Sequence, residues 1–161
     1  MAKKGITLTT LAISIIVITL IASAIIINAT GIVEKAELAK FGEEIKKIED
    51  EYREYYALNG NPPILKDEQY TSEQIVALNT LGYGDKLQRE IEKNGDINSI
   101  FGIINFEEMG LNIDLRVKGE TKDDIYVVSL ATNRVYYLRG VEIANDVYFS
   151  TAYISDTTSI L

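Results

Sequence analysis

The chain has 161 residues, with 16 Lys and Arg against 24 Asp and Glu, and it contains no Cys, His or Trp. This length admits one compact domain with one appendage. Without His or Cys there is no His-based acid–base pair, no thiolate nucleophile, no Cys/His zinc site and no disulfide. We therefore predict a protein that is not an enzyme and that needs no cofactor.

The negative charge is unevenly distributed along the chain. Only Lys3 and Lys4 carry charge before Glu34, so the net charge of −8 becomes −10 for the residues from Glu34 onward. Such an acidic surface repels phosphate, and no cluster of basic and aromatic residues offsets the repulsion. We expect no contact with nucleic acid.

The segment from Ile6 to Ile27 has 22 residues without a charge, of which 16 are apolar. As a helix it is about 33 Å long, which is enough to cross a hydrocarbon core of about 30 Å. The segment is therefore predicted to span a membrane, and Lys3 and Lys4 before it place the N-terminus in the cytoplasm.

A cleaved secretory signal is the first alternative for this segment. Ala22-Ser23-Ala24 has the small residues that signal peptidase recognises. However, Ile25-Ile26-Ile27 after that site is as apolar as the residues before it, so cleavage there would leave an apolar new terminus. This favours the spanning helix.

Lys3-Lys4-Gly5, followed at once by Ile6 and the apolar run, resembles the class III signal of type IV pilins and type II secretion pseudopilins. The resemblance implies that a prepilin peptidase cuts between Gly5 and Ile6 and that Ile6 is then N-methylated. The family usually has Glu at the fifth mature position, where it serves assembly, and Thr10 stands there in this chain.

The resemblance also implies the domain organisation and the function. Residues 1–5 are a cytoplasmic leader, residues 6–33 a transmembrane and filament-core helix, and residues 34–161 an extracytoplasmic pilin-like domain. The expected protein is a structural subunit of a type IV pilus-like filament or secretion pseudopilus. Its partners are copies of itself or other pilins, prepilin peptidase, the assembly machinery and the lipid bilayer.

The same resemblance implies a single-pass protein of the cell membrane that reaches an extracellular filament after assembly. The alternative function is a membrane-anchored extracytoplasmic binding or adaptor domain that does not polymerise.

After the uncharged segment the apolar residues follow steps of three and four: Leu38, Phe41, Ile45, Ile48 and Tyr52. This stripe predicts an amphipathic continuation of the first helix, which then runs from about residue 6 to 58. The sequence Asn59-Gly60-Asn61-Pro62-Pro63 is a strong stop. We predict that the stripe packs on a domain, and a short coiled-coil stalk is the alternative.

The middle of the chain is less regular. Thr71-Ser72 can cap a helix reaching Asn79, and Asp85 can cap another that ends at Asn94-Gly95. Residues 97–106 are apolar enough for a buried strand, and residues 106–110 can add a helical turn.

The C-terminal part is rich in β-branched and aromatic residues. Residues 125–130 and 135–138 read as a hairpin that turns at Asn133, and residues 146–150 as a third strand after a break at Gly140. The predicted fold is α+β, with the long helix packed on a small antiparallel sheet. The C-terminal stretch resembles the sheet of clostridial-type pilin-like proteins, so the predicted fold is pilin-like.

Two sets of residues have side chains that could in principle form a catalytic or metal site. No His is present to activate the serines Ser72, Ser99, Ser129 and Ser150. Neighbouring carboxylates could hold calcium, but adjacent residues point apart on a helix or strand, so the sequence predicts no metal site. The neighbouring pairs are Glu43-Glu44, Asp67-Glu68, Glu107-Glu108 and Asp123-Asp124.

Overall fold

The computed structural model describes residues 8–110 and 125–151, and for most residues between 8 and 30 it describes the backbone alone. The chain divides into two compact units, Met1–Glu37 and Leu38–Leu161. Within the part of the chain that the structure describes, no helix has both the length and the apolarity required to cross a membrane.

Helix α1 runs from Leu8 to Asn59 and confirms the predicted long helix. Its end has two local causes. The Asn59 side-chain amide donates to the carbonyl of Tyr55 at 2.9 Å, and Gly60 takes a φ of +73°, which residues with a Cβ adopt at a cost. The predicted stop at residues 59–63 is therefore confirmed.

A four-stranded antiparallel sheet with the order β1-β2-β3-β4 forms the centre of the second unit. Its strands are β1 (Ile64–Thr71), β2 (Ile100–Ile104), β3 (Tyr126–Ser129) and β4 (Val135–Tyr137). Strand β2 lies inside the predicted strand over residues 97–106. Strand β1 was not predicted, because Lys66, Asp67 and Glu68 interrupt its apolar pattern.

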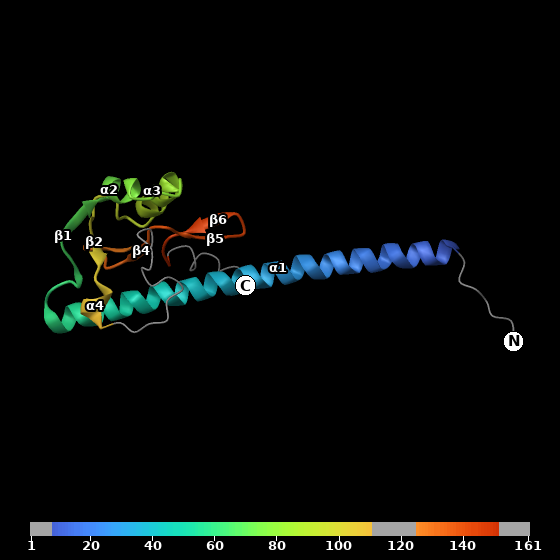
Figure 1. The fold of residues 1–161 in the computed structure, drawn as a ribbon, viewed down its shortest axis with the longest axis horizontal. Helices are drawn as coiled ribbons and strands as arrows, with labels where there is room; N and C mark the ends of the chain where they lie inside the picture. The colour runs from blue at the N-terminus through green and yellow to red at the C-terminus, as the bar shows by residue number, and fades with distance from the viewer. Residues whose placement is uncertain (1–7, 111–124, 152–161) are drawn as a thin grey trace. The chain divides into compact units, whose positions relative to one another are not determined.

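One face of this sheet packs against the part of α1 that follows Leu38 (Figure 1). The stripe residues Phe41, Ile45, Ile48 and Tyr52 are all buried there. Their sheet partners are Ile64, Ile104, Tyr126, Val128, Val135 and Tyr137. The structure therefore confirms that the stripe packs on the domain, and the fold is α+β with the helix on an antiparallel sheet.

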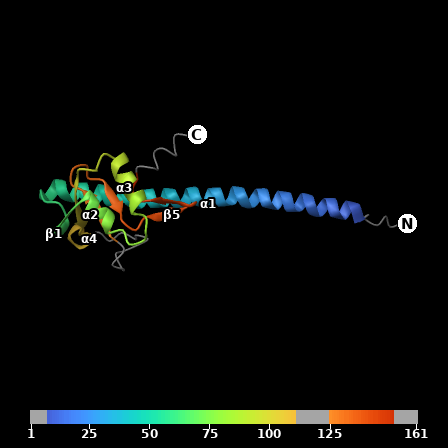
Figure 2. The ribbon, with the colours of Figure 1, turned by 90° about the horizontal axis from the view of Figure 1, so that it is seen from above.

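The other face of the sheet is covered by α2 (Ser72–Ala77) and α3 (Gly84–Lys93), which lie nearest the viewer in Figure 2. The helices contribute Ile75, Leu87 and Ile91. The sheet and the chain after it contribute Phe101, Val127, Tyr136, Leu138, Val147 and Phe149. The second unit thus has three layers, with an apolar core on each face of the sheet.

The helix starts agree in part with the prediction. Thr71 caps α2 through a reciprocal pair of hydrogen bonds with Gln74, as its position before the helix predicts. The predicted cap of α3 at Asp85 is wrong, because the helix begins after Tyr83 and Asp85 lies in its first turn. The Tyr83 backbone N–H donates to the side chain of Asn79 at 3.0 Å, which holds the chain where the helix begins.

The predicted turn over residues 106–110 is confirmed as α4 (Phe106–Met109). The Glu108 backbone N–H donates to the side chain of Asn105 at 3.2 Å, and Gly110 closes the turn with a φ of 63°.

The hairpin of β3 and β4 is confirmed, with Asn133 in the left-handed conformation at a φ of 60°. The predicted three-stranded meander is wrong. Strands β5 (Val141–Ile143) and β6 (Asp146–Tyr148) form a separate two-stranded sheet instead. The left-handed Gly140, at a φ of 72°, turns the chain away from β4 before the new hairpin begins.

Candidate functional site

The residues predicted for processing and assembly lie at the N-terminus. Gly5 and Ile6 are outside the described residues, and Thr10 belongs to α1 with its side chain outside them. The predicted cleavage, methylation and assembly roles therefore stay predictions.

Exposed branched apolar side chains distinguish the first unit. Ile15, Ile18 and Ile32 are 56%, 65% and 69% exposed, and Val33 is exposed as well. Apolar side chains exposed along one helix in this way are typical of a surface that meets lipid or protein.

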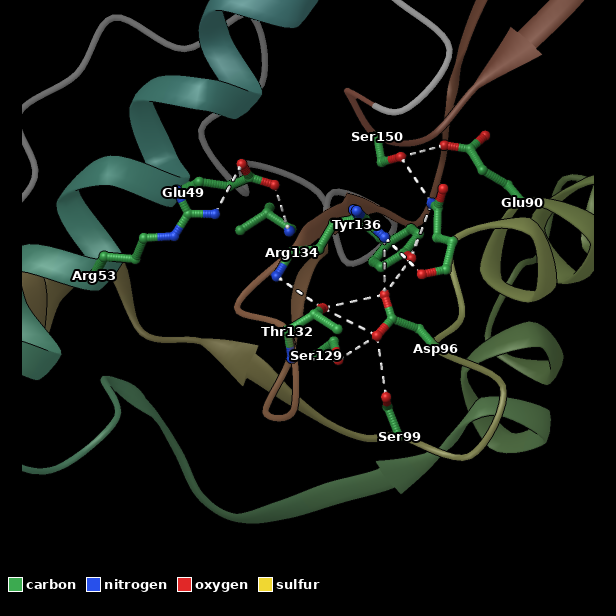
Figure 3. A network of polar contacts seen from close by, with 12 residues as sticks. Glu49, Arg53, Glu90, Asp96, Ser99, Ser129, Thr132, Arg134, Tyr136 and Ser150 are labelled. Atoms are coloured by element: carbon green, nitrogen blue, oxygen red, sulfur yellow. Dashed lines mark hydrogen bonds and ion pairs between the residues drawn. The ribbon is translucent and has the colours of Figure 1, made fainter. Parts of the chain in front are cut away.

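A second, polar site lies inside the domain and was not predicted. The carboxylate of Asp96, directly after α3, is fully buried (Figure 3). It accepts hydrogen bonds from the hydroxyls of Tyr136 at 2.7 Å, Ser129 at 2.8 Å, Thr132 at 3.0 Å and Ser99 at 3.1 Å. Three of these donors belong to the hairpin of β3 and β4, and Ser99 lies directly before β2.

Arg134 supplies the charge that balances Asp96. Its guanidinium lies 3.4 Å from the Asp96 carboxylate and donates to the carbonyl of Asn94 at 3.0 Å. The Asn94 amide donates to the hydroxyls of Tyr136 and Ser150, at 3.0 and 3.3 Å. Burial, together with the bond to Asp96, raises the pKa of the Tyr136 phenol. Tyr136 therefore stays a neutral donor.

Glu90 of α3 continues this network toward the C-terminal segment. Its carboxylate accepts hydrogen bonds from the Ser150 hydroxyl and from the Phe149 backbone N–H, the latter at 3.3 Å. Burial raises the pKa of Glu90, and these bonds and the charge of Arg134 oppose the shift in part. Glu90 thus links α3 to the segment after β6 by hydrogen bonds.

Glu49 plays the matching part on the other face of the sheet. The Val135 backbone N–H, at the edge strand β4, donates to its carboxylate at 3.0 Å, and Arg53 lies 3.6 Å away, one turn later on α1. Burial raises the pKa of Glu49, and the bond from Val135 and the charge of Arg53 oppose the shift. Glu49 therefore covers a sheet edge that could otherwise pair with another strand.

This network explains the serines weighed as nucleophiles. Ser99, Ser129 and Ser150 donate to buried carboxylates, and Ser72 donates to the carbonyl of Ile97 at 2.6 Å. Every buried side-chain polar atom in the described ranges has a partner. Such a satisfied network specifies one arrangement of the core.

Metal ligation was tested against the same geometry. Among residues 8–110 and 125–151, no three or more acidic side chains come close enough together to hold a metal ion. Glu43 is exposed and Glu44 buried, so that pair diverges as expected for neighbours on a helix. The pair Asp123-Asp124 lies outside the described residues.

Sequence reasoning missed Glu49, Glu90 and Asp96 as the centres of these contacts. The available signal was weak: Glu90 lies between Leu87 and Ile91 on the apolar side of an otherwise charged helix. The partners of Asp96 are up to 40 residues away along the chain, so no local pattern indicates them.

Two hollows open on the surface of the second unit. One, of about 290 Å³, is lined by Lys86, Arg89, Glu90, Asp146, Val147 and Tyr148. The other, of about 530 Å³, lies around Tyr83, Arg139 and Glu142. The Tyr83 hydroxyl donates to Glu142 at 3.2 Å, so the second hollow is bridged by its own side chains.

No protein-family model, no curated protein and no solved structure matches this chain.

Proposed function

We propose that the chain is a structural subunit of a type IV pilus-like filament or secretion pseudopilus, matured by a prepilin peptidase. In this proposal the bond between Gly5 and Ile6 is cut and Ile6 is methylated. The uncharged first half of α1 anchors the subunit in the cell membrane with its N-terminus in the cytoplasm. It later packs with other copies in the core of an extracellular filament.

One observation carries the proposal. A single unbroken helix, Leu8–Asn59, joins the uncharged stretch behind a basic leader to the stripe that packs on the antiparallel sheet. Because cleavage at Gly5 falls before the apolar run, the mature protein keeps this helix. The exposed Ile15, Ile18 and Ile32 supply apolar surface for lipid or for neighbouring copies.

Thr10 bears on how such copies would pack. Its hydroxyl cannot form the salt bridge that Glu gives other members of the family. Close packing of helices in lipid, with hydroxyl hydrogen bonds worth about 0.6 to 2 kcal/mol each, would then supply the association. Thr10→Glu should therefore strengthen assembly or be tolerated.

The test is the N-terminus of the mature protein. Full-length chain is produced together with a prepilin peptidase and an assembly machine, and its mass and terminal residue are measured by mass spectrometry. The proposal expects a terminus at Ile6, carrying one methyl group. Gly5→Val should block cleavage, because the peptidase reads a residue without a side chain, and Ala2→Val is the matched control that should still be cut.

The outcomes separate the proposal from its alternatives. A terminus at Met1, or one after Ala24, contradicts prepilin processing. A terminus at Ile6 without surface filaments by electron microscopy favours the membrane-anchored binding or adaptor domain, which does not polymerise.

A further inference from the structure

The hollow of about 290 Å³ has two exposed basic side chains on a domain that is strongly acidic. Lys86 and Arg89 lie one turn apart on α3 and line it, and Lys93 continues the same flank of the helix. Asp85, Gln88 and Glu92 occupy the opposite exposed flank. We call Lys86, Arg89 and the hollow between α3 and β6 the basic hollow.

Two cations, Lys86 and Arg89, and two carboxylates, Glu90 and Asp146, line the basic hollow. Lys86 pairs with Asp146 of β6 at 3.7 Å. Glu90 beneath them is buried and already bonded to Ser150. Arg89, by contrast, is exposed and makes no ion pair or hydrogen bond within the described part of the chain. The hollow thus offers one guanidinium without a direct ion-pair partner among the described residues, in a space that a carboxylate side chain can enter.

A complementary surface lies at the end of α1. The Tyr55 hydroxyl donates to Glu108 of α4 at 3.1 Å, which brings α4 beside the last turns of α1. Glu51 and Glu54 flank Tyr55 on the helix, and Glu107 adjoins Glu108. We call these four glutamates the acidic end.

The acidic end has an excess of negative charge. All four of its carboxylates are exposed, and Glu51, Glu54 and Glu107 make no ion pair within residues 8–110 and 125–151. Lys47, one turn before Glu51, offsets one of the four charges at most.

The two surfaces belong to opposite layers of the domain, so one copy cannot join them within itself. The basic hollow lies on α3, in the layer that packs on one face of the sheet, whereas the acidic end lies on α1 and α4, which pack on the other (Figure 1). A contact between two different surfaces of identical subunits is heterologous, and it continues from copy to copy into a ring or an open filament.

We propose that the acidic end of one copy docks in the basic hollow of the next, with Arg89 as the central contact. This inference rests on the proposed function, which brings the copies together. Docking places the glutamates of one copy next to Arg89 of the next, so opposite charges meet although the acidic domains as a whole repel each other. Such a contact fixes the register of successive domains more than it adds affinity.

The complete absence of Cys from the sequence allows a direct test by cross-linking. Asp146→Cys places a thiol in the hollow and leaves both cations, and Leu58→Cys places one on the exposed end of α1 and leaves all four glutamates. Two full-length chains, one with each change and with different tags, are produced together with the assembly machine and mildly oxidised. Mixed disulfide dimers are expected.

The matched control replaces Asp146→Cys by Gln88→Cys, on the opposite flank of α3, and should give few mixed dimers. Arg89→Glu on the Asp146→Cys chain should lower the yield about tenfold, because an ion pair becomes a like-charge contact. Glu54→Arg on the other chain should restore it.

Three outcomes overturn the docking. The first is equal cross-linking from Gln88→Cys, and the second is dimerisation of Asp146→Cys alone, which indicates a two-fold contact. The third is a lack of mixed dimers. If mature termini at Ile6 and filaments accompany the third outcome, the contact is wrong while the proposed function stands.

Discussion

Isoleucine side chains are exposed in one stretch of α1 and buried in another. Ile15, Ile18 and Ile32 are more than half exposed, whereas Ile45 and Ile48, later on α1, are 0% exposed. The helical backbone is common to both stretches, so the difference lies in what surrounds them. From Leu38 onward the chain supplies its own apolar partner, the sheet, and before Glu37 the described residues supply none.

The two stretches of α1 differ in whether the described residues around them provide an apolar partner. The second unit contains the contacts that stabilise it, namely two apolar cores and a polar network whose buried side-chain atoms all have partners. The isoleucines of the first unit gain a partner from lipid or from another protein in our proposal. Paired substitutions in the two regions test this difference.

The largest effect is expected from a charge in the buried stripe. Ile45→Asp should destabilise the domain by about 4 kcal/mol or more, because a carboxylate replaces a fully buried apolar side chain. Thermal unfolding of the detergent-solubilised full chain, followed by the near-ultraviolet circular dichroism of its tyrosines, measures the loss. Ile32→Asp is the matched control and should leave that transition in place. Equal shifts in the two variants would erase the contrast between the regions.

Removing the centre of the polar network comes next. Asp96→Ala leaves the Arg134 guanidinium and the hydroxyls of Ser129 and Tyr136 without their acceptor, which should cost about 3 to 5 kcal/mol. Urea unfolding measures the difference. Asp50→Ala, at an exposed ion pair with Arg53, should change stability by about 0.5 kcal/mol or less. A small loss in Asp96→Ala would show that the network adds little to stability.

Substitution of two glycines by Ala should change stability in opposite directions, with an intermediate loss at one and a small gain at the other. In Gly102→Ala the new Cβ would lie 2.7 Å from a methyl carbon of Ile64, so the packing must shift at about 1 to 3 kcal/mol. In Gly31→Ala the new Cβ meets nothing within 4 Å, and the helix should gain up to about 1 kcal/mol. Urea unfolding reports the first, and amide hydrogen exchange around residue 31 reports the second. Stabilisation of the domain by Gly102→Ala would contradict the close packing of Ile64.

The smallest effect expected is a pH dependence that belongs to the second unit. Burial raises the pKa of Glu90 above its ordinary value of 4.5, so the folded state binds its proton more tightly than the unfolded chain does. As pH rises from about 4.5 through the folded pKa, this group therefore lowers the free energy of unfolding. Glu90→Gln should flatten the fall, as measured by urea unfolding across that range. Glu92→Gln, on the exposed flank of α3, removes the same charge and should leave the pH dependence of the free energy of unfolding as in the wild type. The same pH dependence in the wild type and both variants would contradict the role of burial.

Elements whose causes are local could be predicted from the residues of their own segment. The run without Pro, the apolar stripe from Leu38 to Tyr52 and the stop at Gly60 predicted one continuous helix, and its C-terminal end was predicted to within one residue. The residues around Asn133 likewise gave the hairpin of β3 and β4. Periodicity and turn residues act over a few positions, so they can be read without knowing the rest of the fold.

Contacts between segments far apart in the sequence could not be predicted in this way. Strand β1 is charged in its middle and becomes a strand because β2 pairs with it. Strand β6 pairs with β5, and the next residue, Phe149, accepts a hydrogen bond from the Tyr137 backbone N–H of β4 at 2.8 Å. Asp96 becomes the centre of the network because Tyr136, 40 residues away, is brought to it. Such contacts depend on the packing of the whole domain, and no short stretch of sequence contains that information.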